Sequence, residues 1–362
     1  MTGEEISCRK SDEYLREDQY KSTWAYMFFP FVFLGYDKMR RLLIRMKTAL
    51  YTTAAVLILL GGLAVLDKNN DFSLTQRESA HKFGATYMTM NNPFFEVINE
   101  TIRATVESNG DILITRDPAL DAVRQTQQIY DLIDEGVEAI FIAPVDFEKI
   151  IPAVEYGRER GVKIIFVDTE IYDESLADCI VVSDNYNAGV LCAEYLLDKK
   201  SEGKILIFEH PTTKSSNDRV EGFVDTIEGK GNFEIVGRLA YAGQLEIAMP
   251  LMIDELKKGT DFDVVFSIND VGALGVMAAL KDYGRLDDIS VLGVDGAPEA
   301  KAMIKEKIML ATSAQYPSEI GQNAVDQLYN MIEGRPVEKK IKVSVNLISE
   351  ENIDEFSTKG WQ

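Results

Sequence analysis

Polar side chains suited to holding a small ligand follow several short apolar runs of the chain. Each of these runs is followed by an amide, a carboxylate or a guanidinium: Asn92, Asp168, Arg219, Asn269, Asp295 and Gln315. Such groups can make paired hydrogen bonds to neighbouring hydroxyls. Phe94 and Phe95, just after Asn92, offer aromatic faces that suit the C–H face of a sugar ring. This pattern favours the binding of a small polar molecule.

The elements that must position these residues alternate between strand and helix. Strands are expected at 83–90, 110–116, 138–144, 163–168, 179–184, 204–209, 233–241, 263–268, 289–295 and 309–315. Helices are expected to begin at Pro93, Ala119, Phe147, Asn187, Ser216, Leu245, Val271, Pro298 and Pro317. This alternation predicts parallel sheets covered on both faces, in two lobes that divide near residues 183–185. Ligands bind beyond the carboxyl ends of such strands, so the polar residues should meet in one cleft.

The composition argues against several classes of function. The 362 residues include 38 basic and 59 acidic ones, a net charge of −21, which disfavours nucleic acid as a partner. Cys8, Cys179 and Cys192 lie far apart, and the only histidines are His81 and His210. Neither a metal site nor a disulfide framework is expected, although a single Cys179–Cys192 bridge remains open.

The chain carries none of the common catalytic or cofactor motifs. It contains no GxGxxG, GxxxxGK[ST], GxSxG or HExxH pattern. His210 stands without a nucleophile or a second carboxylate in a sensible arrangement, and is interpreted as a loop residue. The stretch "GALGVM" at 272–277 falls within a helical pattern and is interpreted as close helix packing. We therefore expect neither an enzyme nor a bound cofactor.

A membrane segment is expected near the N-terminus. Residues 48–66 contain no charged side chain and would span roughly 28 Å as a helix. Basic residues precede this segment, which predicts a cytoplasmic N-terminus and an exported body. Residues 39–66 are either an uncleaved signal anchor, which the sequence favours, or a cleaved signal peptide. Residues 67–80 would form a linker.

Residues 1–38 fit neither of these interpretations. A second apolar stretch at 24–36 is broken by Pro30 and is too short to span a bilayer comfortably. A start codon assigned too early, with translation beginning at Met39 or Met46, is favoured over an interfacial N-terminal helix.

Eight motifs occur in the order typical of one family. They are "MNNPFF", "GVEAIFIAPVD", "GVKIIFVDTE", "VVSDNYNAG", "DRVEGF", "VVFSINDVGALGVMAAL", "VLGVDG" and "LATSAQYPSEIG". Over about residues 80–346 the chain resembles the type I periplasmic binding proteins for sugars, especially the ribose-binding branch. The resemblance implies two doubly wound parallel-sheet lobes, a three-segment hinge and capture of the ligand by closure. Lobe 1 would comprise 81–183 and about 316–345, and lobe 2 would comprise 184–315 and about 346–362.

The resemblance also implies roles for individual residues. Asn92, Phe94 and Phe95 would contact the sugar from the first lobe, and Asp168 would bind ring hydroxyls. The second lobe and hinge would contribute Arg219, Asn269, Asp295 and Gln315.

Three positions depart from the ribose branch. Thr169 stands where that branch has an arginine, and Val294 stands where it has an aromatic residue. The stacking phenylalanine of the second lobe falls near Gly243, with Tyr241 as a candidate substitute. Thr169 and Tyr241 therefore join the expected ligand-binding residues, and a monosaccharide other than ribose is favoured.

Several of these residues also have a purely structural interpretation. Asn92 followed by Pro93 is a good helix start, and Asn269 could simply cap the next helix. Asp168 and Asp295 could be turn residues. Their joint occurrence at strand ends favours binding.

Function follows from this resemblance as an expectation. The chain would be an extracytoplasmic solute-binding protein that delivers a monosaccharide to the permease of an ABC importer. The alternative is a membrane-anchored receptor that presents the sugar to a sensor histidine kinase. A transcriptional repressor core of the LacI type is a distant third, because a basic DNA-binding module would have to stand where the apolar segment lies.

Overall fold

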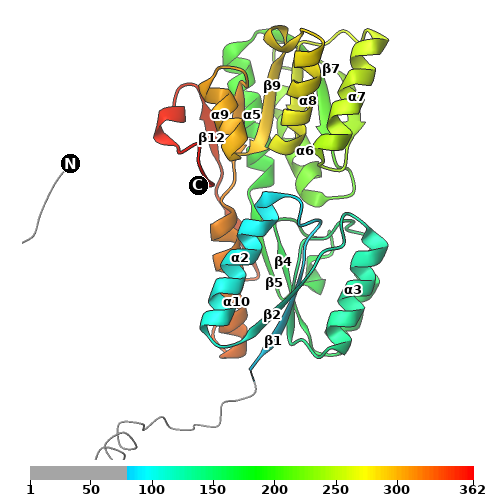
Figure 1. Cartoon of the computed structure of the whole chain (residues 1–362), viewed down its shortest axis with the longest axis vertical. Coiled ribbons are helices and arrows are strands. Elements are labelled where there is room, and N and C mark those ends of the chain that lie inside the picture. The colour runs from blue at the N-terminus through cyan, green and yellow to red at the C-terminus, as the bar shows by residue number, and fades with distance from the viewer. Residues whose placement is uncertain (1–79) are drawn as a thin grey trace, which may run out of the picture. The chain divides into compact units, whose positions relative to one another are not determined.

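The structure, a computed structural model, describes residues 80–362, which form two α/β lobes (Figure 1). The predictions for residues 1–38, for the signal anchor or signal peptide at 39–66 and for the linker up to residue 79 lie outside the described residues. Across residues 80–362, none of the helices is both long enough and apolar enough to cross a bilayer.

Lobe 1 is built on a six-stranded sheet with the order β11-β5-β4-β3-β1-β2, in which every neighbouring pair is parallel. Its strands are β1 (Lys82–Thr86), β2 (Ile112–Arg116), β3 (Ala139–Ile142), β4 (Lys163–Val167), β5 (Cys179–Ser183) and β11 (Lys340–Val343). Its helices are α2 (Pro93–Ser108), α3 (Ala122–Asp134), α4 (Ile151–Glu159) and α10 (Pro317–Ile332), with the 3-10 turn η1 (Glu174–Leu176).

All of β3, and β4 after its first residue Lys163, are apolar and buried because both faces of the sheet are covered. On β3, Phe141 points into a core shared with α2 and α10, whereas Ile140 and Ile142 point into a second core shared with α3 and α4. Figure 1 shows α2 and α10 on one side of this sheet and α3 on the other. The sheet is thus held between two helical layers.

Lobe 2 repeats this architecture with the strand order β12-β10-β9-β8-β6-β7, and only β12 runs antiparallel to its neighbour. Its strands are β6 (Glu202–Glu209), β7 (Asn232–Ala240), β8 (Val264–Ser267), β9 (Ser290–Asp295), β10 (Ala311–Ala314) and β12 (Asn346–Ser349). Its helices are α5 (Asn185–Lys199), α6 (Lys214–Ile227), α7 (Leu245–Lys258), α8 (Asp270–Asp282) and α9 (Pro298–Lys305), with the 3-10 turns η2 (Leu286–Asp288) and η3 (Ile353–Glu355).

The chain crosses between the two sheets three times. The crossings lie between β5 and α5, between β10 and α10, and between β11 and β12. The second crossing contains Gln315, one of the predicted site residues. Each lobe therefore combines segments that are distant in the sequence.

Helices α5 and α6 pack with their backbones in direct contact. A Cβ atom added at Gly189 would lie 2.0 Å from the carbonyl oxygen of Arg219. This contact fixes α6, which carries Arg219, against α5. In the same way, a Cβ atom at Gly275 would lie 2.8 Å from the carbonyl oxygen of Leu245, so the interpretation of "GALGVM" as close helix packing is confirmed.

All ten predicted strands occur, with shifted ends, but β11 and β12 were not predicted. Both are only four residues long and are partly exposed, so their sequences lack a clear apolar pattern. Helix α3 begins at Ala122 rather than Ala119, because Ala119 and Leu120 have φ angles of 50° and 65°. The Asp121 side chain then caps the helix, because its Oδ1 accepts hydrogen bonds from the backbone amides of Val123 and Arg124.

Helix α4 also begins later than predicted, at Ile151 rather than Phe147. The Phe147 amide is used elsewhere, since it donates a hydrogen bond to the carbonyl oxygen of Thr212 in the other lobe. Helices α5, α6 and α8 begin one or two residues earlier than predicted.

The two cysteines of the described region do not form the bridge that the sequence left open. Cys179 and Cys192 are both free and buried. Cys179 belongs to the core of lobe 1 and Cys192 to the core of lobe 2.

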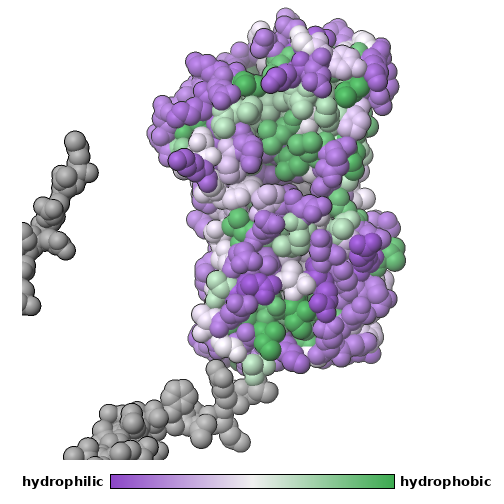
Figure 2. Space-filling model, viewed as in Figure 1, coloured by the Kyte–Doolittle hydropathy of each residue, from purple (hydrophilic) through white to green (hydrophobic). Residues whose placement is uncertain are grey.

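Hydrophilic side chains dominate the face drawn in Figure 2, with smaller groups of apolar residues on both lobes.

Candidate ligand-binding cleft

A cavity lies between the two lobes, at the carboxyl ends of the strands. The space in it that protein atoms leave free is about 480 Å³, including the part that is open to solvent. The segments that follow β1 and β4 line it from lobe 1, and the loops after β6, β7, β8 and β9 line it from lobe 2.

Eight of the ten predicted ligand-binding residues line this cavity: Asn92, Phe94, Phe95, Asp168, Arg219, Asn269, Asp295 and Gln315. The other two, Thr169 and Tyr241, do not. Most of the residues predicted from their positions after strands therefore meet in one cavity. Structural causes explain why Thr169 and Tyr241 lie outside it.

Asn92 is both a helix cap and a cavity residue. Its Oδ1 accepts a hydrogen bond of 3.0 Å from the Phe94 amide, and Pro93 occupies the first helical position. Its Nδ2 has no protein partner within residues 80–362. The cap therefore holds the side chain in place while its amide nitrogen stays available to a ligand.

The two phenylalanines are fixed by packing against other rings. Phe94 meets Phe95 edge to face at 5.7 Å between ring centroids, and meets Trp361 at 5.5 Å. Phe95 packs on Tyr87 at 5.9 Å. These contacts hold both rings at the cavity wall.

Asp168 is a buried carboxylate with an unusual backbone. It directly follows β4, is 5% exposed and has a φ angle of 66°. In the part of the chain that the structure describes, its carboxylate has no hydrogen-bond or ion-pair partner. Burial raises the pKa of Asp168 to about 7, an effect that the positive charge of Arg219 opposes.

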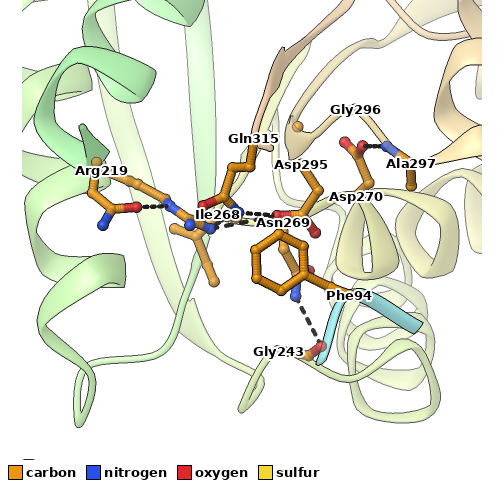
Figure 3. A network of polar contacts seen from close by, with 12 residues as sticks. Phe94, Arg219, Gly243, Ile268, Asn269, Asp270, Asp295, Gly296, Ala297 and Gln315 are labelled. Carbon is orange, nitrogen blue, oxygen red and sulfur yellow. Dashed lines mark hydrogen bonds and ion pairs between the residues drawn. The ribbon is translucent and has the colours of Figure 1, made fainter. Parts of the chain in front are cut away.

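Arg219, Asp295 and Gln315 form the polar centre of the cavity (Figure 3). Arg219 donates from Nε to Asn185 Oδ1 at 2.8 Å and from Nη1 to the Ile268 carbonyl at 2.7 Å. The same Nη1 lies 3.7 Å from Asp295 Oδ1, which accepts a second contact from Gln315 Nε2 at 2.6 Å.

Asp295 is ionised less readily than an ordinary aspartate. Burial raises the pKa of its carboxyl group to about 6, while Arg219 acts in the opposite direction. Gln315 Oε1 is buried and has no hydrogen-bond partner in the described part of the chain. Two acceptors, this oxygen and the Asp168 carboxylate, thus remain unused.

Asn269 caps helix α8 and lines the cavity at the same time. Its Oδ1 accepts hydrogen bonds from the Gly272 amide at 2.8 Å and from Tyr241 Oη at 2.6 Å, and its Nδ2 donates to the Gly243 carbonyl at 3.1 Å. One amide hydrogen of Asn269 is left for a ligand.

Tyr241, which was predicted to substitute for a stacking phenylalanine, does not line the cavity. Its ring is fully buried and packs against Phe208 at 5.7 Å, away from the cavity. Tyr241 lies behind Asn269 and acts on the site through the hydrogen bond to the amide oxygen. The strand β7 ends at Ala240, so Tyr241 turns into the core while Ala242, Gly243 and Gln244 line the cavity.

Thr169 joins the lobes and does not line the cavity. Its Oγ1 accepts a hydrogen bond of 3.1 Å from the Ser215 amide in the first turn of α6. A second contact between the lobes runs from Asn217 Nδ2 to Tyr172 Oη at 3.2 Å. These hydrogen bonds therefore connect the two lobes directly.

The sequence analysis missed five polar residues of the cavity wall: Thr89, His210, Thr213, Ser215 and Gln244. His210 is the loop residue that was predicted, but it also lines the cavity. Its position directly after β6 is the same signal that identified Asp168 after β4. Burial lowers the pKa of His210, which favours the neutral imidazole, and its Nδ1 lies 3.1 Å from Thr212 Oγ1.

Asp270 faces away from the cavity and braces it. Its carboxylate accepts hydrogen bonds from the Ala297 amide at 2.8 Å and from Thr312 Oγ1 at 2.7 Å (Figure 3). It thereby ties α8 to the loop after β9 that carries Asp295. Within residues 80–362, histidine, cysteine and acidic side chains form no group of three that could hold a metal ion.

Comparison with known proteins identifies the family. The model of the periplasmic binding protein domain matches residues 83–336. This chain belongs to the periplasmic binding protein family. The family is one of ligand-binding domains, and the resemblance to the type I sugar-binding proteins is confirmed.

Individual relatives cover most of the described region. The ribose import binding protein RbsB of Bacillus subtilis is 31% identical over 266 residues, which are 73% of this chain and 86% of that protein. An ABC transporter solute binding protein from Bacillus halodurans, solved with myo-inositol, is 26% identical with a TM-score of 0.72, covering 77% of this chain and 98% of that one.

A second solved structure gives the same result. The solute binding protein of an ABC transporter from Mycobacterium smegmatis, solved with glycerol, is 27% identical with a TM-score of 0.73, and the match covers 78% of this chain and 100% of that one. The prediction of two α/β lobes of the type I periplasmic binding protein fold is thus confirmed.

Proposed function

We propose that this chain captures a small polyhydroxy ligand, a monosaccharide or a related polyol, between its lobes and delivers it to an ABC importer. The observation that supports this most is the convergence of eight of the predicted side chains on one cavity. They come from both lobes and from the crossing that contains Gln315. A ligand that contacts all of them bridges the lobes.

The cavity offers both acceptors and donors to hydroxyl groups. Asp168 and Gln315 Oε1 are acceptors without protein partners in the described residues. Asn92 Nδ2, the remaining amide hydrogen of Asn269 and the unused N–H groups of Arg219 are donors. The rings of Phe94 and Phe95 would cover the apolar face of the ligand.

Closure explains how binding is coupled to the shape of the protein. The Thr169–Ser215 and Tyr172–Asn217 hydrogen bonds already join the lobes and would hold them together around a bound ligand. Closure removes water from the cavity and so strengthens the polar contacts inside it. Micromolar affinity requires about −8 kcal/mol, which several such contacts and ring stacking can supply net of the cost of closure.

The site of action would be the outer face of the cell membrane. The uncharged segment 48–66, preceded by basic residues, would anchor the chain there, or would be cleaved as a signal peptide. A permanent anchor also suits a receptor that presents its ligand to a sensor histidine kinase, and this is the second candidate function. The importer is favoured because one relative is named as a ribose import binding protein and a solved one as an ABC transporter solute binding protein.

A thermal-shift screen tests the binding function. The full-length chain, in a mild detergent, would be heated with pentoses, hexoses, inositols and glycerol in turn. We expect a saturable rise of the melting temperature with one class of ligand, because a ligand that binds only the folded state stabilises it. The shift should be lost in Asp168→Ala and Arg219→Ala.

A matched control is Asp121→Asn, which removes one negative charge outside the cavity and retains a good helix cap. This variant should respond like the wild type. A folded protein that responds neither to these compounds nor to their amino derivatives would refute the proposal. Loss of uptake of the identified ligand in cells that lack this chain would support the importer over the receptor.

A further inference from the structure

The charges that line the cavity do not balance. Asp168 and Asp295 are acidic, Arg219 is the only lysine or arginine among the lining residues, and burial favours the neutral form of His210. Within the described residues the cavity wall therefore carries two carboxylates against one permanent cation.

Arg219 cannot neutralise both carboxylates. Its Nε and Nη1 are hydrogen-bonded to Asn185 and to the Ile268 carbonyl, and Nη1 faces Asp295 at 3.7 Å. For Asp168 the structure gives no ion pair and no hydrogen bond to any described residue, although it is 5% exposed. The unbalanced negative charge is thus located at Asp168.

The lysines near the cleft are engaged with another acid. Lys340 Nζ lies 3.0 Å from Glu170 Oε1, and Lys214 Nζ lies 3.7 Å from the same oxygen. Lys214 also pairs with Asp218 at 2.7 Å. Neither lysine lines the cavity, so neither compensates Asp168.

Next to Asp168, the cavity also offers more hydrogen-bond acceptors than donors. Both oxygens of Asp168 and the Oε1 of Gln315 are acceptors that lack a partner in the described chain. The hydroxyl of Thr169, next to Asp168, is turned away and accepts from Ser215. A ligand group with several N–H donors and a positive charge satisfies this side of the cavity better than a hydroxyl, which has one donor.

We propose that the ligand is a cationic amino sugar or amino polyol, whose ammonium group contacts the Asp168 carboxylate while its hydroxyls face Arg219, Asn92 and Asn269. This inference rests on the binding function proposed above and narrows its ligand class. An ammonium group pairs with the buried carboxylate, which would otherwise remain buried and unpaired at a large cost.

The Asp168 carboxyl group is readily protonated because it is buried. Burial raises the pKa of Asp168 to about 7, and the negative charges of Asp295 and Glu170 act in the same direction against Arg219. A bound cation would favour the ionised carboxylate.

Isothermal titration calorimetry with matched pairs of compounds tests the proposal. Glucose would be compared with its 2-amino, 3-amino and 6-amino derivatives, galactose with galactosamine, and myo-inositol with an amino-substituted inositol, each at pH 7 with the full-length chain. In the pair whose ring fits the cavity, the amine should bind at least tenfold more tightly. Acetylation of the same nitrogen, which removes its charge, should abolish that preference.

Two variants connect the preference to Asp168. Asp168→Asn keeps the shape and removes the charge, so the amine should lose its advantage over the neutral sugar by tenfold or more. Asp121→Asn, which removes a charge outside the cavity, should keep the wild-type ratio. Neutral sugars that bind as tightly as their amines in every pair would overturn the inference and leave the binding function intact. A folded chain that binds no member of any pair would overturn both.

Discussion

The hydroxyl of Thr169, which follows strand β4 of lobe 1, accepts a hydrogen bond of 3.1 Å from the amide of Ser215 in the first turn of helix α6 of lobe 2. Thr169 thus links the two lobes. Its position next to Asp168 places this contact beside the unpaired carboxylate.

Replacement of Thr169 by valine should weaken ligand binding without a change to the cavity wall. The variant keeps the buried shape but removes the oxygen that accepts the hydrogen bond from the Ser215 amide. This loss should destabilise the form in which the lobes touch by about 0.5–1.5 kcal/mol. We expect ligand dissociation, measured by stopped-flow fluorescence, to accelerate roughly two- to tenfold. Thr169→Ser retains the hydroxyl and should behave like the wild type. Equal rates for Thr169→Val and the wild type would mean that this hydrogen bond does not hold the closed form.

Replacement of Tyr241 by phenylalanine separates support of the site from stacking on the ligand. The variant keeps the ring and removes the hydroxyl that donates to Asn269 Oδ1 at 2.6 Å. If Tyr241 positions Asn269, affinity in calorimetry should fall about two- to tenfold, corresponding to one hydrogen bond. A ring that stacked on the ligand would instead leave affinity unchanged in this variant.

Replacement of Gly189 by alanine should destabilise lobe 2 strongly. The new methyl group would lie 2.0 Å from the Arg219 carbonyl oxygen, so helices α5 and α6 must separate. Overpacking of this kind costs about 1–3 kcal/mol or more in the free energy of unfolding, measured by urea denaturation. Gly360→Ala is the control, since no atom lies within 4 Å of an added Cβ there. Equal stability of the two variants would contradict the close packing of α5 on α6.

In the ligand-free protein, the contribution of Asp168 to the free energy of unfolding should fall as the pH rises from about 4 to about 7. Its folded-state pKa is raised to about 7, so the folded protein holds this proton over a range in which the unfolded chain releases it. The contribution is fully present below the unfolded pKa and is lost as the pH passes through the folded one. Asp168→Asn should flatten this part of the profile in urea denaturation, whereas Asp121→Asn should not. Parallel profiles for wild type and Asp168→Asn would refute the assignment.

The order of elements and most of the cavity could be predicted because both follow from local patterns. Apolar runs such as β3 and β4 mark buried parallel strands, and the residues directly after strands mark the cleft. Asn92 and Asn269 carry two signals at once, since each caps a helix and lines the cavity. The segment after β6 contributed only Arg219 to the predicted site, because His210 was interpreted as a plain loop residue, although it follows the strand directly and lines the cavity.

The misplaced residues depend on contacts that no local pattern contains. The orientation of Tyr241 follows from the end of β7 at Ala240 and from packing against Phe208. The role of Thr169 depends on the approach of α6 from the other lobe. Strands β11 and β12 are short edge strands whose pairing is determined by the sheets that they join.

The three crossings between the sheets have a consequence for biosynthesis. Strand β11 occupies an edge of the first sheet and β12 an edge of the second, and both lie beyond residue 339. Neither sheet can be complete until residues 340–349 have emerged from the ribosome, so neither lobe can finish folding early in translation. Both sheets of the described chain are therefore completed within the same short segment, near the end of synthesis.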